Sequence, residues 1–298
     1  MRITRLGEFG LIERIKARIS SDASVKKGIG DDCAVLAYNK DKYLLLTCDM
    51  LLEGVDFKPH EDPYFVGRKA IAVSLSDIAA CAGLPRHCLV SLGMPRNTSV
   101  KFFDRLLAGM LSLARKYNVN IVGGDLSRAS ELVIDVSMLG IVEKKRLVLR
   151  SGACLGDIIF VSAPLGGSIK GKHLRFTPRI KEARFLTQKF KINSMIDISD
   201  GLAQDLSHIL KTSNVGAFIY EGLIPLDKKA GNLQDALFMG EDFELLFTLA
   251  SKDAKKLISM RQNMFWPIGE IVDKKYNLRL VDQRGRLRAI PIKGFRHF

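Results

Sequence analysis

Aspartates recur along the chain where a short apolar run ends or a glycine turn begins. The stretch MIDISDGLAQD places Asp197 and Asp200 between a strand-like run and a helix-like repeat. The stretches GIGDD, LLLTCD and IVGGD add Asp31, Asp32, Asp49 and Asp125. Each aspartate alone is most simply a turn or cap residue, and we expect Asp200 to be the N-cap of the helix that follows. Together they favour a hard cation such as Mg²⁺, which prefers oxygen ligands and is often shared with substrate phosphates.

Asp77 is the only charged residue between Lys69 and Arg86. It lies in a stretch from about residue 63 to 82 that we expect to form a helix buried nearly all round. An ionised carboxylate there is costly unless it is paired or binds a metal. The five histidines are scattered and the five cysteines form no C-x-x-C pair, so we expect no zinc site. We interpret the cysteines as reduced thiols of a cytoplasmic protein.

A glycine-rich stretch from Gly166 to Lys172 matches the first part of a phosphate-binding P-loop, G-x-x-x-x-G-K. The next residue of that motif is Ser or Thr, which holds Mg²⁺, and this chain has His173 there. The motif also opens a helix, whereas Pro178 follows after a few residues. We therefore expect a basic loop and no P-loop.

The composition, with 47% hydrophobic and 26% charged residues and a mean hydropathy of +0.08, is that of a folded soluble protein. The net charge of +14 is spread along the chain as doublets without interleaved aromatics, so we expect no nucleic-acid partner. It also suits anionic small substrates or a hot or saline habitat. We expect no membrane span and no signal peptide. An amphipathic N-terminal helix, carrying Phe9, Ile12, Ile15 and Ile19 on one stripe, is predicted to pack on the core.

The order of the patterns predicts two α/β units, residues 1–145 and 146–298. Further helices are predicted over VKFFDRLLAGMLSLARKYN and near residues 179–190, 200–213 and 252–262. The strand-like runs are GIGDDCAVLAY, YLLLTCDM, CLVSLGM, VNIVGGD, ELVIDVSMLGIVE, DIIFVSA, SMIDIS, AFIY, FELLFTLA and WPIGEIV.

The chain resembles thiamine-monophosphate kinase, a family of the aminoimidazole ribonucleotide synthetase-like superfamily, nearly from end to end. The resemblance is carried by GEFGLIERI, GIGDDCAVL, LTCDMLLEGVDF, KAIAVSLSDIAACAGLPRHCLVSLGMP, IVGGDLSR, RSGACLGD, MIDISDGLAQDLSHI, MGEDFELLFT and the terminal KGFRHF. It implies two domains, each a mixed sheet packed with helices, in a homodimer. It also implies ATP and several Mg²⁺ ions in the cleft between the domains, with thiamine monophosphate as the phosphoryl acceptor.

The resemblance implies roles residue by residue. The Mg²⁺ ligands would be Asp32, Thr47, Cys48, Asp49, Asp77, Asp125, Asp197 and Asp200, where Cys48 replaces an expected hydroxyl residue and can offer its backbone. The residues that hold ATP would be Gly124, Asp125, Arg150 and Ser199. The substrate contacts would be Asp56, Glu241 and Phe295. No residue would act as a nucleophile, because the acceptor is already an anionic phosphate oxygen and Arg150 and the metal ligands act electrostatically.

Three departures from the family pattern keep an alternative open. Asp56 stands where the family usually has a substrate-contacting His, and Phe176 stands where a Pro is expected. The segment between Gly167 and His173 is also shorter than the family's usual helix. The alternative is a relative that binds nucleotide without this turnover, or that phosphorylates another phosphate acceptor.

Overall fold

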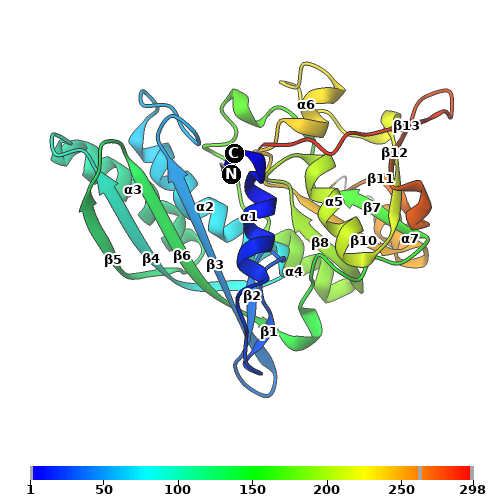
Figure 1. Cartoon of the computed structure of the whole chain (residues 1–298), viewed down its shortest axis with the longest axis horizontal. Helices are drawn as coiled ribbons and strands as arrows, with labels where there is room; N and C mark the ends of the chain where they lie inside the picture. Colours follow the sequence, from blue (N-terminus) through cyan, green and yellow to red (C-terminus); the bar gives the residue numbers. More distant parts are fainter. Residues whose placement is uncertain (1–2, 261–263, 296–298) are drawn as a thin grey trace.

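The computed structural model describes residues 3–260 and 264–295, in which two mixed sheets lie side by side (Figure 1). The first sheet has the strand order β1-β2-β3-β6-β4-β5, and only its β4–β5 pair is parallel. Its strands are β1 (Val25–Lys27), β2 (Ala34–Ala37), β3 (Lys42–Leu52), β4 (Leu84–Met94), β5 (Asn120–Arg128) and β6 (Val133–Glu143).

Two helices, α2 (Pro63–Ala80) and α3 (Val100–Lys116), belong to this first sheet. Asp62 caps α2 by accepting the N–H of Tyr64, and the hydroxyl of Ser99 caps α3. The two helices touch backbone to backbone, because a Cβ on Gly67 would lie 2.0 Å from the Leu106 carbonyl oxygen. Helix α2 is apolar nearly all round and packs between β3 and β6 on one side and the C-terminal half on the other.

The opposite face of the first sheet remains largely open to solvent. Along β3 the side chains alternate, so that Leu45 is fully buried while Leu46 and Met50 are 43% and 55% exposed. On β4, Leu89 is 48% exposed. The first sheet is therefore covered on one face only.

The second sheet has the order β13-β12-β9-β11-β7-β10-β8, and only its β12–β9 pair is parallel. Its central strands are buried on both faces, since Phe160 and Phe247 join one apolar cluster while Val161 and Leu246 join another. The strands are β7 (Asp157–Val161), β8 (Ile192–Asp197), β9 (Gly216–Tyr220), β10 (Leu245–Ala250), β11 (Trp266–Val272), β12 (Leu278–Val281) and β13 (Leu287–Ala289).

The remaining α-helices are α1 (Gly7–Lys16), α4 (Ile180–Lys189), α5 (Leu202–Ser213), α6 (Leu233–Phe238) and α7 (Ser251–Ser259). Short 3-10 helices cover Ile3–Arg5, Lys144–Arg146, Ser168–Lys170, Glu221–Leu223 and Lys274–Tyr276. None of the helices in residues 3–260 and 264–295 is both long and apolar enough to span a bilayer.

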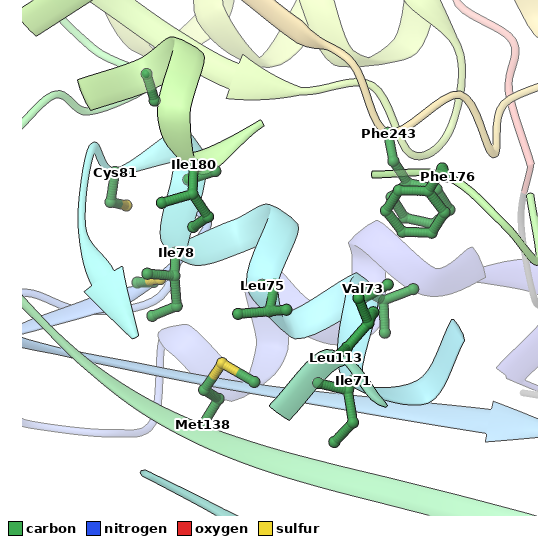
Figure 2. Close-up of a cluster of buried hydrophobic side chains, with 14 of the residues drawn as sticks. Ile71, Val73, Leu75, Ile78, Cys81, Leu113, Met138, Phe176, Ile180 and Phe243 are labelled. Carbon is green, nitrogen blue, oxygen red and sulfur yellow. The ribbon is translucent and has the colours of Figure 1, made fainter. Parts of the chain in front are cut away.

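One apolar cluster passes from the first sheet into the second without a break. Figure 2 shows Ile78 and Leu75 of α2 near Ile180 of α4, with the rings of Phe176 and Phe243 beyond them. Those two rings stack with their centroids 4.2 Å apart. Helix α2 is therefore shared by the cores of both halves.

The predicted α/β class, with mixed sheets packed with helices, is confirmed, and the predicted buried helix is α2. The prediction that the N-terminal helix packs on the core is wrong, because no residue of α1 is buried and Ile15 and Ile19 are 54% and 53% exposed. The spacing of apolar residues predicts which side of a helix is apolar, but it does not predict which part of the protein covers that side.

Candidate functional site

An acidic cluster lies where the two halves meet. Asp32 follows the Gly30 turn, Asp77 lies on α2, and Asp197 is the last residue of β8. Each offers one carboxylate oxygen, and the three oxygens lie within 4.8 Å of one another. Asp32 and Asp197 are only 8% and 3% exposed. The structure thus brings together three of the carboxylates that the sequence singled out.

Burial and mutual repulsion disfavour ionisation of these carboxylates. Burial raises the pKa of Asp77 well above its usual value, and the charges of Asp49 and Asp197 raise it further. Burial, followed by the charge of Asp32, raises the pKa of Asp197 to about 7. Burial also raises the pKa of Asp49 to about 6. Such a group of carboxylates is stabilised by a cation placed among them.

Hydroxyl groups hold three of the carboxylates in place. Thr47 Oγ1 donates to Asp77 Oδ2. On α2, Ser74 Oγ donates to Asp49 at 2.6 Å, and Ser76 Oγ donates to Asp197 at 2.6 Å. Sequence reasoning missed Ser74 and Ser76, although both lie within three residues of Asp77 in the same buried helix.

Arg150 lies in the link between the sheets and is the cation that meets this cluster. Its Nη2 is 2.8 Å from Asp32 Oδ1, and its backbone N–H donates to Asp31 Oδ1 at 3.1 Å. Burial lowers the pKa of Arg150, but the charges of Asp32 and Asp31 outweigh it and raise that pKa. Asp32 Oδ2 is buried and has no hydrogen-bond partner within the described residues, and the buried Asp31 Oδ2 faces Lys27 Nζ at 3.5 Å. The unpartnered oxygen of Asp32 fits a metal site.

The turn after β8 forms a second acidic group, in which Asp200, Asp205 and His208 each offer an atom within 4.8 Å of the others. Asp205 Oδ2 accepts the N–H groups of Asp200 and Gly201 at 3.1 and 3.0 Å. The prediction that Asp200 is the N-cap of this helix is therefore wrong, because the N-cap is Gly201 and no side chain caps from that position. Asp205 was missed, and the available signal was an acidic residue in the first helical turn.

Ser199 offers its carbonyl oxygen to the N–H of Glu241 at 2.7 Å. The carbonyl oxygen of Asp200 accepts the N–H of Phe295 at 3.1 Å, and Phe295 itself is 37% exposed. These bonds place Ser199, Asp200, Glu241 and Phe295, all predicted site residues, around one turn.

A buried lysine organises the neighbouring end of the site. Lys69 of α2 is fully buried, and its Nζ donates to Glu241 Oε2 and, at 2.7 Å, to the carbonyl oxygen of Asp56. His173 Nδ1 lies 3.4 Å from the same Glu241 oxygen. Burial raises the pKa of Glu241, while the charge of Lys69 opposes that rise. Sequence reasoning missed Lys69, although a cation inside an apolar helix signals a buried partner.

Asp56 turns toward its own loop, because its Oδ2 accepts the N–H of Leu52 at 2.8 Å.

The glycine-rich stretch from Gly166 to Lys172 forms no P-loop, in agreement with the sequence analysis. The Gly166 N–H donates to Asp242 at 3.0 Å, and Lys172 Nζ pairs with Glu244 at 2.9 Å. The α-helix that follows, α4, begins only at residue 180.

Gly124 and Asp125 lie apart from the cluster. In the sheet register Ser91 is the cross-strand neighbour of both Asp125 and Asp135, and these side chains lie on the open face. Asp49 instead points to α2 on the covered face, where it accepts from Ser74. Strand β5 is three strands from β3, which corresponds to about 14 Å at the usual strand spacing. Cys48 also faces the open side, where its Sγ lies 3.2 Å from Asp135 Oδ2. One copy of the chain does not bring Gly124, Asp125 or the Cys48 thiol to the buried carboxylates, whereas the Cys48 backbone lies between Thr47 and Asp49 on β3.

Comparisons with known proteins identify the family of the chain. Residues 30–142 match the family described as "AIR synthase related protein, N-terminal domain", and residues 147–281 match the corresponding C-terminal domain. A thiamine-monophosphate kinase of Buchnera aphidicola (from Acyrthosiphon pisum) is 34% identical, covering 98% of both chains. One from Aquifex aeolicus is 39% identical over 83% of this chain and 87% of the relative.

A solved structure, AaThiL complexed with AMPPCP and TMP, has a TM-score of 0.88 and 34% identity, covering 100% of this chain and 99% of that one. A hydrogenase maturation protein HypE has a TM-score of 0.71 at 18% identity, which shows a shared fold alone. The family matches cover most of the chain, and the kinase relatives align over nearly all of it. The chain therefore belongs to the thiamine-monophosphate kinase family of AIR synthase related proteins.

Proposed function

We propose that this protein transfers the γ-phosphoryl group of ATP directly to thiamine monophosphate, forming thiamine diphosphate in thiamine biosynthesis. The observation that carries the proposal is the buried cluster of Asp32, Asp77 and Asp197, drawn from both halves of a chain in this kinase family. The relative AaThiL, which binds an ATP analogue and TMP, matches the whole chain and supports the same substrates.

The acceptor oxygen of thiamine monophosphate is already anionic, so the chain needs no nucleophile and no strong base. Its task is to align two polyanions and to offset their repulsion. Arg150, fixed by Asp31 and Asp32, supplies a positive charge that does not titrate near neutral pH. Lys69 holds Glu241 toward the acceptor end of the site, and the turn at Ser199 links Glu241 to the acidic cluster.

We propose Mg²⁺ as the resident metal, with Asp32, Thr47, Cys48, Asp49, Asp77, Asp197 and Asp200 as the residues of this copy that hold it. When bound, Mg²⁺ neutralises phosphate charge and orients the transferred group. The buried Asp32 oxygen without a hydrogen-bond partner among the described residues and the raised pKa of Asp77 support a cation here.

We further propose a homodimer, in which residues 1–145 form the dimerising unit and residues 146–298 complete the nucleotide cleft. Strand β2 pairs with β3 only at residues 43–46, while β3 continues to Leu52, and β5 lies at the sheet edge. Pairing of these two free edges between copies would bring the partner subunit's Asp125 beside Thr47 and Asp49. The separation of Asp125 from the cluster within one copy supports this arrangement.

A cytoplasmic location is part of the proposal, and the free thiols of Cys33, Cys81 and Cys88 support it. The test of function is turnover of purified protein with Mg²⁺-ATP and thiamine monophosphate, followed by chromatography of thiamine diphosphate. Stoichiometric ADP and thiamine diphosphate are expected. Binding of ATP without thiamine diphosphate formation would favour the alternative of a nucleotide-binding relative or another acceptor.

A further inference from the structure

Two buried thiols lie beside the turn that carries Asp31 and Asp32. Cys33 follows Asp32 directly, and Cys81 is the C-cap residue of α2, just beyond Ile78 (Figure 2). The two cysteines are 1% and 0% exposed. Cys81 Sγ accepts hydrogen bonds from both the thiol and the backbone N–H of Cys33. The fold therefore pairs two thiols that are far apart along the sequence and belong to no C-x-x-C motif.

Two carboxylates adjoin this pair of thiols. Asp31, Asp32 and Cys81 each offer one ligand atom, and the three atoms lie within 4.8 Å of one another. The side chains of Asp31 and Asp32 are 0% and 1% exposed. Asp32 Oδ2 has no hydrogen-bond partner within the described residues. A buried carboxylate oxygen left unpaired is unfavourable, so this atom calls for a cation beside it.

The mixture of sulfur and oxygen atoms selects the class of cation. Mg²⁺ takes oxygen ligands in octahedral geometry, to which a thiolate contributes poorly. Zn²⁺ and similar thiophilic cations take four ligands, and thiolate sulfur and carboxylate oxygen are both among those that they accept. The backbone N–H of Cys33 that points at Cys81 Sγ is an outer contact of the kind that supports a metal-bound ligand.

The charges of this group balance around a divalent cation. Two thiolates and two carboxylates together carry four negative charges. Arg150 Nη2 lies 2.8 Å from Asp32 Oδ1, and Lys27 Nζ lies 3.5 Å from Asp31 Oδ2. These two basic side chains and one divalent cation leave the buried group neutral, which avoids the cost of an unpaired charge. A cavity of about 640 Å³, lined in part by Asp31 and Asp32, gives an ion a path to them.

We propose that Cys33, Cys81, Asp31 and Asp32 form a site for a thiophilic divalent cation, with Zn²⁺ as the cation that fits best. Binding forms two metal–sulfur bonds and releases the two thiol protons to solvent. Because Asp32 is also a proposed Mg²⁺ ligand, Zn²⁺ at this site withdraws a carboxylate from Mg²⁺. The site is therefore inhibitory, although its formation does not depend on the proposed function.

The test loads metal-free protein with Zn²⁺ or Cd²⁺ alone, in the absence of nucleotide. X-ray absorption spectroscopy of the Zn²⁺-loaded wild type is expected to show two sulfur ligands at about 2.3 Å, with oxygen ligands at about 2.0–2.2 Å. This measurement identifies the ligand atoms without any substitution. A zinc ion surrounded only by nitrogen and oxygen atoms would overturn the inference.

Cd²⁺ titration, followed through the ultraviolet absorbance of the thiolate-to-metal charge transfer, measures the affinity of the site. Cys33→Ala and Cys81→Ala are each expected to weaken Cd²⁺ binding by roughly 100-fold or more, because each removes one ligand atom. Cys88→Ala removes a buried thiol of β4 that is not part of the group, and it should bind Cd²⁺ as the wild type does. The inference fails if the wild type shows no such absorbance, or if either of the first two variants retains wild-type affinity.

Competition with Mg²⁺ tests the inhibitory role. Zn²⁺ is expected to raise the Mg²⁺ concentration needed for half-maximal turnover, and Cys81→Ala should remove this effect. Inhibition that is equally strong in Cys81→Ala would place the inhibitory zinc elsewhere and overturn that role. Failure of the proposed function has a different signature, because the wild type would then bind Zn²⁺ through two sulfur atoms without phosphorylating thiamine monophosphate.

Discussion

In the second sheet, strand β10 buries Leu246 against the cluster that contains α5 and Phe247 against the cluster that contains α4 and α7. In the first sheet, strand β3 buries Leu45 against α2 and leaves Leu46 43% exposed. The chain thus covers both faces of one sheet and one face of the other. The C-terminal half thus covers both faces of its sheet within one chain, whereas the N-terminal half leaves a face that the proposed homodimer would cover.

The largest expected effect is a loss of stability when a cavity is created in the core of the second sheet, which is covered on both faces. Phe247 is fully buried between Phe160 and Phe265, with ring centroids 5.4 and 5.5 Å away. Phe247→Ala should lower the free energy of unfolding by about 3–5 kcal/mol. Urea unfolding measures this loss, which should not depend on protein concentration. A loss that vanishes at high concentration would show that oligomerisation, not this core, stabilises the C-terminal half.

The boundary between the two sheets should be where activity is most sensitive. Asp49→Asn, on β3 of the first sheet, and Asp200→Asn, in the turn after β8, should each lower turnover by roughly two to three orders of magnitude. Each substitution removes charge from the site that stabilises the transferred group. Circular dichroism should show both variants folded. Asp41→Asn, in the loop between β2 and β3, is the matched control. Wild-type turnover in either variant would remove that aspartate from the site.

The open face can be tested with a charge. If the proposed homodimer covers this face, Leu89→Glu on β4 should raise its dissociation constant more than 100-fold, about 2.7 kcal/mol, because an unpaired carboxylate would be buried between copies. Light scattering during gel filtration measures the shift, and activity should fall with the dimer population. Ile258→Glu, at a residue of α7 that is 54% exposed where Leu89 is 48% exposed, should leave the dimer intact. A Leu89→Glu dimer with wild-type affinity would refute a homodimer that covers this face.

A smaller effect should appear when Mg²⁺ is removed at different pH values. Burial and Asp32 raise the pKa of Asp197 from 3.8 to about 7, so its favourable contribution to folding without metal is present at low pH and is lost as pH rises from about 4 to 7. Mg²⁺ at ten times its dissociation constant should add about 1.4 kcal/mol. Thermal unfolding should therefore show a larger Mg²⁺ stabilisation at pH 8 than at pH 5.5. An equal shift at both values would place the metal elsewhere.

Much of the fold and part of the site were predictable because their signals are local. The long strands and α3 have clear periodicity, α2 is marked by a long apolar run, and aspartates at a glycine turn and a strand end indicated Asp32 and Asp197. The short strands β1, β12 and β13 span only three or four residues and show little pattern. Lys69 could not be paired from sequence, because its partner Glu241 lies 172 positions away.

The cap at the start of α5 shows a different limit. The rule for helix caps selects the residue just before the helix, but Gly201 there has φ of +114° and no side chain. The N–H groups of Asp200 and Gly201 are instead satisfied by Asp205, from inside the helix. Asp200 therefore does not cap the helix, and it remains part of the acidic turn after β8.

The apolar cluster that passes from α2 into α4 and β10 has a consequence for folding cooperativity. Two halves with separate cores can unfold one after the other, whereas halves that share buried side chains lose their packing together. The only tryptophan of the sequence, Trp266, is in strand β11 of the second sheet. Its fluorescence and the circular dichroism of the whole backbone should consequently follow one denaturant transition, and two separate midpoints would mean that α2 does not couple the halves.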